Sequence, residues 1–341
     1  MKEKPKIGIV GTGVYLPEER ITAEEIAEKT EGVWAAEAIE EKLGISEKVI
    51  PGSDDGTQEM GVRAGLDALE NTGVDPKDID VILCIGEEWK EYPLTTSGIY
   101  IQEQIGATNA WAIDVQQRCC TTVSAMKIAQ DMMIADDEIE TVMIVGGYRN
   151  SDFVDYSDPD LSMMYNLGAG GGAIILQKNY DQNLLLGTQI ITDGSLARDA
   201  GVKYGGTKHP ITEENLDKAY KLNIFDPEHM KSRLKEVSMK NWFECIEKAF
   251  AKADIPQEEL DYLAVLHFKR SMHEYMLEEL GLEDEGSIYL NEYGHLGQID
   301  QILSIHLALE EGKIEDGTVI SMIAAGIGYV WAANVIRWGK C

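Results

Sequence analysis

The sequence predicts an α/β protein in which helices cover a largely buried β-sheet. Two observations support this prediction. Short apolar runs that read as buried strands alternate with amphipathic stretches along all 341 residues. Hydrophobic residues make up 44% of the chain and charged residues 26%, so the chain can bury a large core and is not a disordered acidic tail.

The predicted strands are the short apolar runs, beginning with KIGIV near the N-terminus. They lie at 6–10, 79–85, 141–146, 172–177, 184–192, 261–267, 286–290, 317–324 and 332–338. The predicted helices are longer stretches with apolar residues at helical spacing. They lie at 23–43, 57–72, 95–105, 120–134, 231–253, 271–281 and 298–311. Residues 193–230 show no period, so we expect a long loop or cap there, and such loops are often functional.

The two halves of the chain are similar to each other at low resolution. The stretch TGVDPKDIDVILCI at 72–85 recurs as ADIPQEELDYLAVLH at 253–267. In both, a helix is followed by a loop with Pro, an acidic turn and a strand that begins at Asp. An internal duplication is the simplest interpretation. We therefore expect an N-terminal half at 1–178 with a nucleophilic cysteine and a C-terminal half at 179–341 with catalytic histidines.

The charge balance excludes several classes of partner. Lys and Arg total 30 against 60 Asp and Glu, which gives a formal net charge of −30. Such a surface repels phosphate backbones and anionic lipid heads, so neither nucleic acid nor a membrane is an expected partner. The N-terminus lacks the apolar core of a signal peptide, and no apolar run reaches the about 18 residues of a membrane helix. A cytoplasmic protein is expected.

The cysteine and histidine pattern gives no sign of a metal site. The five cysteines include no CxxC pair, and the six histidines form no HExxH or similar pair. An odd number of cysteines in a cytosolic chain also argues against a disulfide framework. The glycine-rich stretch YNLGAGGGAIIL at 165–176 reads as a loop into a strand, so no dinucleotide site is expected there.

The segment AIDVQQRCCTTVSAMKIAQDMM at 112–133 is the most informative stretch for chemistry. Cys119 lies where an apolar strand end gives way to a helical pattern. Unpaired N–H groups and the helix dipole at such a junction favour the thiolate, which is the nucleophilic form. An ordinary buried cysteine is the alternative from local sequence alone. Cys120 lies one residue further on and points elsewhere, so we expect it to be a packing residue.

Two histidines and one glycine turn are further candidates. His267 closes the strand DYLAVLH, where open α/β sheets place their sites, although a hydrogen-bonded structural histidine is an equal alternative. His295 lies in the Gly-flanked turn NEYGHLGQ, whose glycines let the backbone approach a ligand closely. In GIGYVWAANVIRW, Gly326 and Gly328 could present backbone N–H groups to a developing oxyanion, although a tight turn is the alternative.

These segments together resemble the thiolase superfamily. Within it, they are most similar to the β-ketoacyl-acyl-carrier-protein synthase III branch and the neighbouring archaeal-type 3-hydroxy-3-methylglutaryl-CoA (HMG-CoA) synthases. The resemblance runs in order through IGIVGTGVYLPEERIT, VIPGSDDGT, the DVQQRC turn, YNLGAGGGAIIL, the histidine strand, YGHLG and GIGYVWAANVIRW. It implies a five-layered αβαβα sandwich built from two duplicated βαβαβ halves, and a homodimer.

The resemblance also assigns roles to individual residues. Cys119, five residues after Asp114, matches the cysteine that is acylated, and His267 matches the first catalytic histidine. His295 stands where this branch usually carries Asn and resembles the Cys-His-His set of elongating ketosynthases. Gly328 matches the glycine whose N–H forms the oxyanion hole together with that of Cys119.

Two parts of the sequence match the pattern of the family less closely. Glu88 or its neighbour Glu87 falls where HMG-CoA synthases keep a catalytic glutamate, and the sequence does not decide which of the two reaches the site. The residues after His267 lack the usual pattern of the family. The resemblance therefore implies the fold more firmly than the exact reaction.

The implied activity is an acyltransferase reaction of the 3-oxoacyl synthase III type, in which an acyl-cysteine is condensed with a second thioester to form a carbon–carbon bond. No metal or organic cofactor is needed. An HMG-CoA-synthase-like condensation is the alternative that the glutamate pair supports and His295 opposes. A non-catalytic scaffold subunit is a third hypothesis. The joint retention of four residues argues against it, namely Cys119, His267, His295 and Gly328.

Charge also bears on the thioester carrier. In synthase III enzymes the helix after the catalytic histidine forms part of a basic patch for acidic acyl carrier protein. Here that helix, 273–285, carries many carboxylates and neither Lys nor Arg. Because like charges weaken an interface, coenzyme A thioesters are the expected substrates and carrier protein is disfavoured. Lys269 and Arg270, with Lys203 and Lys208, are candidates for binding the phosphates of coenzyme A.

Overall fold

A single mixed sheet runs through the protein. The computed structural model describes residues 5–340, and within that range nine strands are joined in the order β11-β12-β13-β8-β1-β7-β6-β4-β5. Their bounds are β1 Ile7–Tyr15, β4 Val81–Cys84, β5 Trp111–Asp114, β6 Thr141–Tyr148, β7 Gly170–Lys178, β8 Gln182–Thr192, β11 Tyr262–Val265, β12 Val319–Gly326 and β13 Val330–Lys340. Four short strands form two small ribbons, β2 Arg20–Thr22 with β3 Glu47–Val49 and β9 Ala200–Val202 with β10 Leu222–Ile224.

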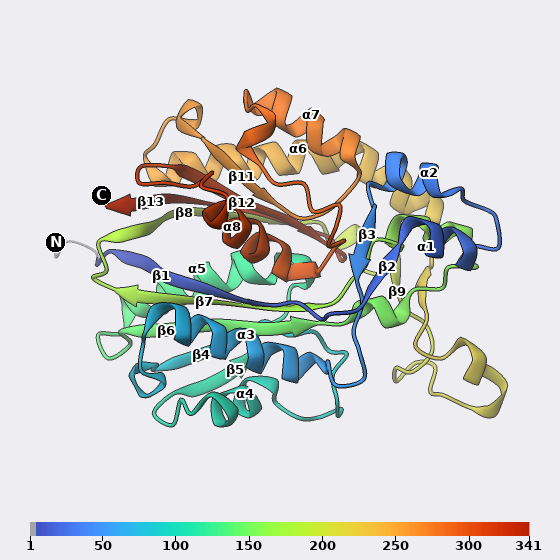
Figure 1. Cartoon of the computed structure of the whole chain (residues 1–341), viewed down its shortest axis with the longest axis horizontal. Helices are drawn as coiled ribbons and strands as arrows, with labels where there is room; N and C mark the ends of the chain where they lie inside the picture. Colours follow the sequence, from blue (N-terminus) through green and yellow to red (C-terminus); the bar gives the residue numbers. More distant parts are fainter. Residues whose placement is uncertain (1–4, 341) are drawn as a thin grey trace.

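The two halves of the sheet form two layers, and helices lie between these layers and outside each of them (Figure 1). The helices are α1 Ala23–Lys29, α2 Ala36–Ala38, α3 Thr57–Thr72, α4 Ser97–Ile105, α5 Thr121–Ala135, α6 Pro227–Ala253, α7 Arg270–Leu280 and α8 Asp300–Glu310. The helices α5 and α8 lie between the two halves of the sheet, with α3 and α4 outside one half and α6 and α7 outside the other (Figure 1). This arrangement is the five-layered αβαβα sandwich that the resemblance implies.

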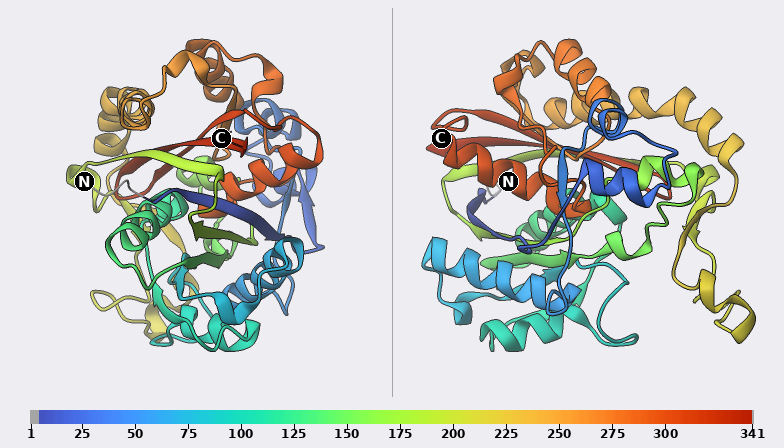
Figure 2. Two further views of the ribbon diagram at one scale, coloured as in Figure 1. Left: turned by 90° about the vertical axis from the view of Figure 1, so that its left-hand side faces the viewer. Right: turned by 45° about the vertical axis from the view of Figure 1, so that its right-hand side comes forward.

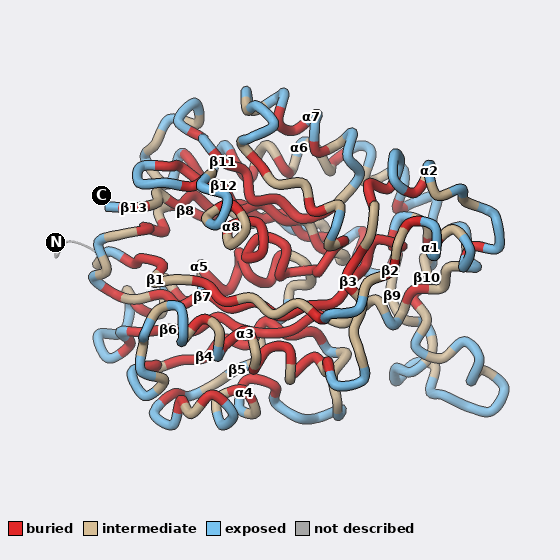
Figure 3. The backbone as a smooth tube through the Cα atoms, viewed as in Figure 1, coloured by how far each residue is buried: buried red, intermediate tan, exposed pale blue. Residues whose placement is uncertain are grey.

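Burial follows these layers. The strands β4, β6 and β11 are buried at every position, as is most of β7 and β12 (Figure 3). Continuous apolar strands of this kind are expected where helices cover both faces of a sheet. The helix α8 is buried over most of its length because it lies in the middle layer.

The two halves of the sheet repeat one pattern. The order β1-β7-β6-β4 in the first half corresponds to β8-β13-β12-β11 in the second. In each half the first three pairings are antiparallel, antiparallel and parallel. The halves join through β1 and β8 at Gly8 and Leu184. We propose that they descend from a duplication and that the division into 1–178 and 179–341 falls between β7 and β8.

The structure corrects three of the expected elements. Residues 286–290 form no strand. The long predicted helix at 23–43 is split into α1, α2 and a π-helical turn at Ile39–Leu43. The region 193–230 is not wholly irregular, because it contains the β9–β10 ribbon and the start of α6, and the segment between β9 and β10 stands away from the main body (Figure 2). Long-range pairing, which leaves no local period, produces the ribbon.

Within residues 5–340, no helix combines the length and the apolar composition that a membrane crossing requires.

Candidate active site

Cys119 lies at the start of the middle-layer helix α5. The strand β5 ends at Asp114, and a short 3-10 turn at Arg118–Cys120 leads directly into α5. Arg118 adopts a left-handed backbone with φ 53°, which is uncommon for a residue other than glycine and sharpens the turn. Asp114 has a structural role, because its carboxylate accepts hydrogen bonds from the N–H groups of Ser97 and Gly98 at the start of α4.

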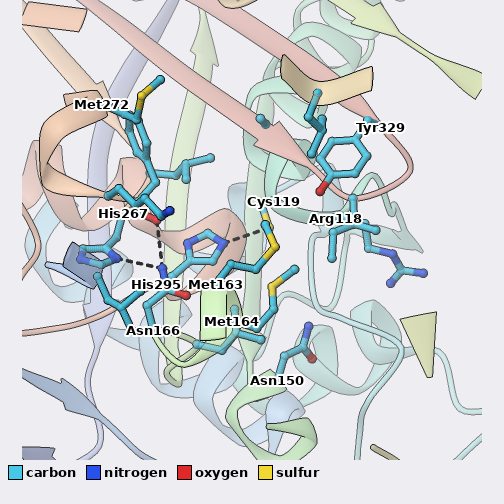
Figure 4. A pocket seen from close by; sticks show the side chains of 18 of the residues that line it. Arg118, Cys119, Asn150, Met163, Met164, Asn166, His267, Met272, His295 and Tyr329 are labelled. Carbon is cyan, nitrogen blue, oxygen red and sulfur yellow. Dashed lines mark hydrogen bonds between the residues drawn. The ribbon is translucent and has the colours of Figure 1, made fainter. Parts of the chain in front are cut away.

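The sulfur of Cys119 belongs to a three-residue line of contacts. His295 places its Nε2 atom 3.1 Å from Sγ (Figure 4). On its other side, the Nδ1 atom of His295 lies 2.5 Å from Oδ2 of Asp300, the first residue of α8. The order of cysteine, histidine and carboxylate is that of a nucleophile, its base and the group that orients the base.

Asp300 is fixed in a fully buried position. Its Oδ1 accepts a hydrogen bond of 2.6 Å from the N–H of Leu296, and its Oδ2 accepts one of 2.7 Å from the N–H of His267. The carboxylate therefore connects both histidine segments. Sequence reasoning did not identify Asp300, although an Asp five residues after His295 in an apolar helix start is a signal that could have indicated it.

The surroundings of His295 favour the charged form of its imidazole. Burial disfavours the charged imidazole, but Asp300 and Cys119 outweigh this effect and raise the pKa of His295 well above its usual value. A protonated imidazole beside sulfur stabilises the thiolate, which is the nucleophilic form of cysteine. The helix start behind Cys119 acts in the same direction.

His267 lies close by but is bonded differently. Its Nδ1 atom is 3.0 Å from the amide nitrogen of Asn166, and its Nε2 atom is 3.0 Å from the carbonyl oxygen of Gly44. Because an amide nitrogen donates and a carbonyl accepts, the ring is neutral with its hydrogen on Nε2. Burial also lowers the pKa of His267 to about 4. His267 lines the cavity, but protein groups occupy both of its ring nitrogens.

Asn166 is a second residue that the sequence did not single out. It lies in the glycine-rich stretch before β7, and its carbonyl accepts a hydrogen bond of 2.7 Å from the N–H of His295. Gly168 in turn donates to the carbonyl of His295 at 2.8 Å. The glycine-rich stretch therefore holds the backbone of His295, as well as the ring of His267, in place.

A mainly apolar cavity of about 340 Å³ surrounds the cysteine. Both histidines line it, together with four methionines and several aromatic side chains (Figure 4). These apolar lining residues are Met163, Met164, Met239, Met272, Phe153, Trp242, Phe268 and Tyr329. Methionine is flexible and polarisable, so such walls can adapt to apolar groups of different shapes.

The structure separates the two candidate glutamates. Glu87 is buried and lines the cavity, whereas the Glu88 side chain is mostly exposed. Arg118 bonds both, at 2.8 Å to Glu87 and 3.2 Å to Glu88. Burial raises the pKa of Glu87, although Arg118 opposes the shift. If either glutamate acts on a substrate, the geometry favours Glu87.

The remaining predicted residues are distributed unevenly. Lys269 lines the cavity, whereas Arg270 stacks on the ring of Tyr289 with its Cζ atom 4.2 Å from the ring centroid. Gly328 is not among the cavity-lining residues, although its neighbours Ile327 and Tyr329 are. Its contribution to an oxyanion hole stays a prediction.

Several other candidates lie apart from the cavity. Lys203 lies near the β9–β10 ribbon with its Nζ 5.3 Å from the ring centroid of Tyr204, and Lys208 lies in the segment between β9 and β10 that stands away from the main body.

Cys120 is buried, with its Sγ atom 3.6 Å from the carbonyl oxygen of Val330. Burial raises the pKa of this thiol well above its usual value, as expected for a packing residue. In the part of the chain that the structure describes, no group of three His, Cys, Asp or Glu side chains could hold a metal ion.

Contacts from a cysteine through a histidine to a buried carboxylate, at a strand–helix junction of a five-layered α/β sandwich, are the arrangement expected of an acyltransferase of the thiolase type. Family models agree with this class. The model for 3-oxoacyl-[acyl-carrier-protein (ACP)] synthase III matches residues 113–194, and the model for its C-terminal part matches residues 250–338. The chain belongs to this family, a branch of the thiolase superfamily whose members are acyltransferases.

Individual relatives match over nearly their full length. The β-ketoacyl-[acyl-carrier-protein] synthase III of Synechocystis sp. is 27% identical over 332 residues, covering 97% of each chain. That of Listeria welshimeri is 28% identical and covers 98% of this chain and 99% of its own. The solved structures of the synthase III proteins from Aquifex aeolicus and Thermus thermophilus give TM-scores of 0.82 and 0.83 at 22% and 21% identity. Each covers 98% of this chain and 100% of its own. These structures show the shared fold.

Proposed function

We propose that this protein takes an apolar acyl group from a coenzyme A thioester onto Cys119 and then passes it to a second substrate. The observation that carries the proposal is the line of contacts from Sγ of Cys119 through His295 to the buried Asp300. Because this line opens into a mainly apolar cavity, the acyl chain has a place to bind beside the nucleophile.

The first half-reaction follows from the charges of the pair. The thiolate of Cys119 attacks the thioester carbonyl, and backbone N–H groups near the sulfur hold the oxyanion. The carbon–sulfur bond to coenzyme A then breaks. The departing thiolate takes the proton from the imidazolium of His295, which leaves a neutral imidazole beside the acyl-cysteine.

Charge supports coenzyme A over acyl carrier protein as the donor. The helix α7 follows the loop of Lys269 at the edge of the cavity, and its exposed positions include Glu274, Glu278 and Glu279. An acidic carrier protein would meet like charge on this helix. Lys269 is the cation best placed for a phosphate of coenzyme A, because it lines the cavity itself.

For the second half-reaction, the family favours a Claisen-type condensation with another thioester. The relatives named β-ketoacyl synthase III support this candidate. An HMG-CoA-synthase-like condensation is supported only by the position of Glu87 at the cavity. Both reactions need hydrogen-bond donors for an enolate, and the Nε2 atom of His295 that faces the sulfur can donate only while it carries a proton.

Intact-mass analysis tests the proposal directly. The protein is incubated with acyl-CoA esters from acetyl to dodecanoyl, and the mass gained is compared between wild type, Cys119→Ala and Cys120→Ala. Wild type and Cys120→Ala should gain one acyl group, with a preference for longer chains, and Cys119→Ala should gain none. An adduct that persists in Cys119→Ala, or no adduct with any ester in wild type, would refute the proposed acyl-enzyme.

We also propose that the protein is a homodimer that pairs through β5. This strand is at one edge of the sheet, and its outward side chains Trp111 and Ile113 are exposed. Ile99 of the adjacent helix α4 adds to this apolar surface. An open apolar edge strand favours pairing with another strand. Light scattering should give a dimer for wild type and a monomer for Ile113→Lys, and a monomeric wild type would contradict the proposal.

A further inference from the structure

We propose that the acyl group on Cys119 is transferred to the hydroxyl group of an apolar alcohol, with His295 as the general base, so that the product is an ester. The inference rests on the proposed acyl-enzyme and concerns only the second substrate. It follows from how the two histidines and Asp300 are bonded.

His295 has the arrangement that a general base requires. Its Nδ1 atom faces the carboxylate of Asp300 at 2.5 Å, which fixes the ring and its tautomer and stabilises the imidazolium that forms when Nε2 takes a proton. The same Nε2 atom lies 3.1 Å from the sulfur that carries the acyl group. A hydroxyl group that approaches the acyl carbon therefore has its proton within reach of a base.

The arrangement suits a carbon nucleophile less well. An enolate formed by decarboxylation brings no proton for a base to remove, and it needs hydrogen-bond donors at its oxygen. His267 is the residue from which a second donor is expected. Its only N–H donates to the carbonyl of Gly44, and its other nitrogen accepts from Asn166. His267 could serve an enolate only after the bond to Gly44 is broken.

Asp300 helps to hold His267 in the position in which both of its ring nitrogens are bonded to protein groups. The oxygen that orients His295 also accepts a hydrogen bond from the backbone N–H of His267. One buried carboxylate thus fixes a base at the sulfur and anchors the segment whose histidine is bonded within the protein. The apolar walls limit the access of water, so an alcohol with an apolar body can compete with hydrolysis.

The transfer balances as follows. The alcohol oxygen attacks the carbonyl carbon of the acyl-cysteine as its proton moves to Nε2 of His295. The tetrahedral intermediate collapses by breaking the bond between carbon and sulfur. The products are the ester and the pair of Cys119 thiolate and His295 imidazolium, which is the state that begins the next cycle.

The experiment starts from isolated acyl-enzyme. Wild type is loaded to completion with the acyl-CoA that gives the fullest adduct, separated from free donor, and mixed with buffer, benzyl alcohol, 1-octanol, benzylamine or malonyl-CoA. Intact mass follows the loss of the acyl group, and chromatography with mass detection identifies the product. At least one alcohol should speed the loss about tenfold or more over buffer and give the ester.

Variants separate base catalysis from access to the acyl group. His295→Gln and Asp300→Asn are loaded at pH 9, where a cysteine forms thiolate without a neighbouring cation, and are then returned to the pH used for wild type. Discharge by the alcohol should then fall roughly 10²-fold, the usual span for a positioned base. Hydroxylamine, which attacks thioesters without a base, should discharge all three proteins at similar rates.

The outcomes are distinct. Three results overturn the inference and leave the acyl-enzyme standing. They are discharge only by malonyl-CoA with a 3-oxoacyl product, discharge only by benzylamine, and no acceleration by either alcohol. Equal alcohol rates in wild type and both variants overturn the role of His295. If no acyl-enzyme forms with any donor, the proposed function fails as well.

Discussion

Replacing Asp300 by Asn should make the reactivity of Cys119 strongly dependent on pH. With the carboxylate present, the pKa of His295 is raised well above its usual value, so the imidazolium that stabilises the thiolate persists through neutral pH. Without it, the sulfur loses the cation that stabilises its thiolate, so the thiolate forms less readily at low pH than at high pH. Alkylation by iodoacetamide should then be roughly 10²-fold slower at pH 6.5 than at pH 9, because only the thiolate reacts.

The same substitution has a definite cost in stability. The two oxygens of Asp300 accept hydrogen bonds from the N–H groups of Leu296 and His267 and from the ring of His295. An amide offers only one oxygen, so at least one buried N–H loses its acceptor whichever way the amide turns. The loss of one such bond costs about 1–3 kcal/mol. Urea unfolding of wild type and Asp300→Asn measures this difference.

The assay follows iodoacetamide addition by intact mass between pH 6 and pH 9. Wild type should react at a nearly constant rate across this range. Asp80→Ala is the control, because Oδ2 of Asp80 accepts backbone hydrogen bonds from Glu140 and Thr141, and Asp80 lies just before the start of β4, outside the cavity lining. It should lose stability without a change in alkylation. If Asp300→Asn also keeps the wild-type rate at pH 6.5 within about twofold, the proposed role of Asp300 is wrong.

Three further predictions concern pH, the glutamates and the thioester carrier. Burial lowers the pKa of His267, and of the buried His273 in α7, to about 4. The unfolded chain therefore binds more protons below pH 6.5, and the free energy of unfolding should fall from there to pH 4. His273→Phe should remove about half of this loss in urea titrations, and an unchanged slope would count against it. Glu87→Gln changes a cavity-lining carboxylate and should alter acyl-transfer rates at least about tenfold. Glu88→Gln changes a mostly exposed side chain and should alter them less than about twofold. Equal effects would contradict the choice of Glu87 as the glutamate at the site. With matched coenzyme A and carrier-protein donors, acylation at low salt should favour coenzyme A, and a clear preference for carrier protein would argue against the role given to α7.

The sequence alone determined the class of fold and indicated Cys119 as the candidate nucleophile. Apolar strands and amphipathic helices have local periods, so α3 at Thr57–Thr72 has the predicted bounds. The junction that places Cys119 ahead of α5 is also local, because β5, the turn and the helix follow one another in the chain. Motifs in the right order then sufficed to indicate the family.

Only the tertiary structure decided how the site is bonded. The carboxylate of Asp300 reaches the backbone N–H of His267 from 33 residues away, and Gly44 reaches the ring of His267 across 223 residues. The distinction between Glu87 and Glu88 is likewise a matter of which side chain the fold turns inward. Such contacts leave no local pattern, because pairing between distant segments depends on the packing of the layers. The sequence could therefore name the histidines, but only the fold shows that one faces the sulfur with a carboxylate behind it while the other is bonded to the protein itself.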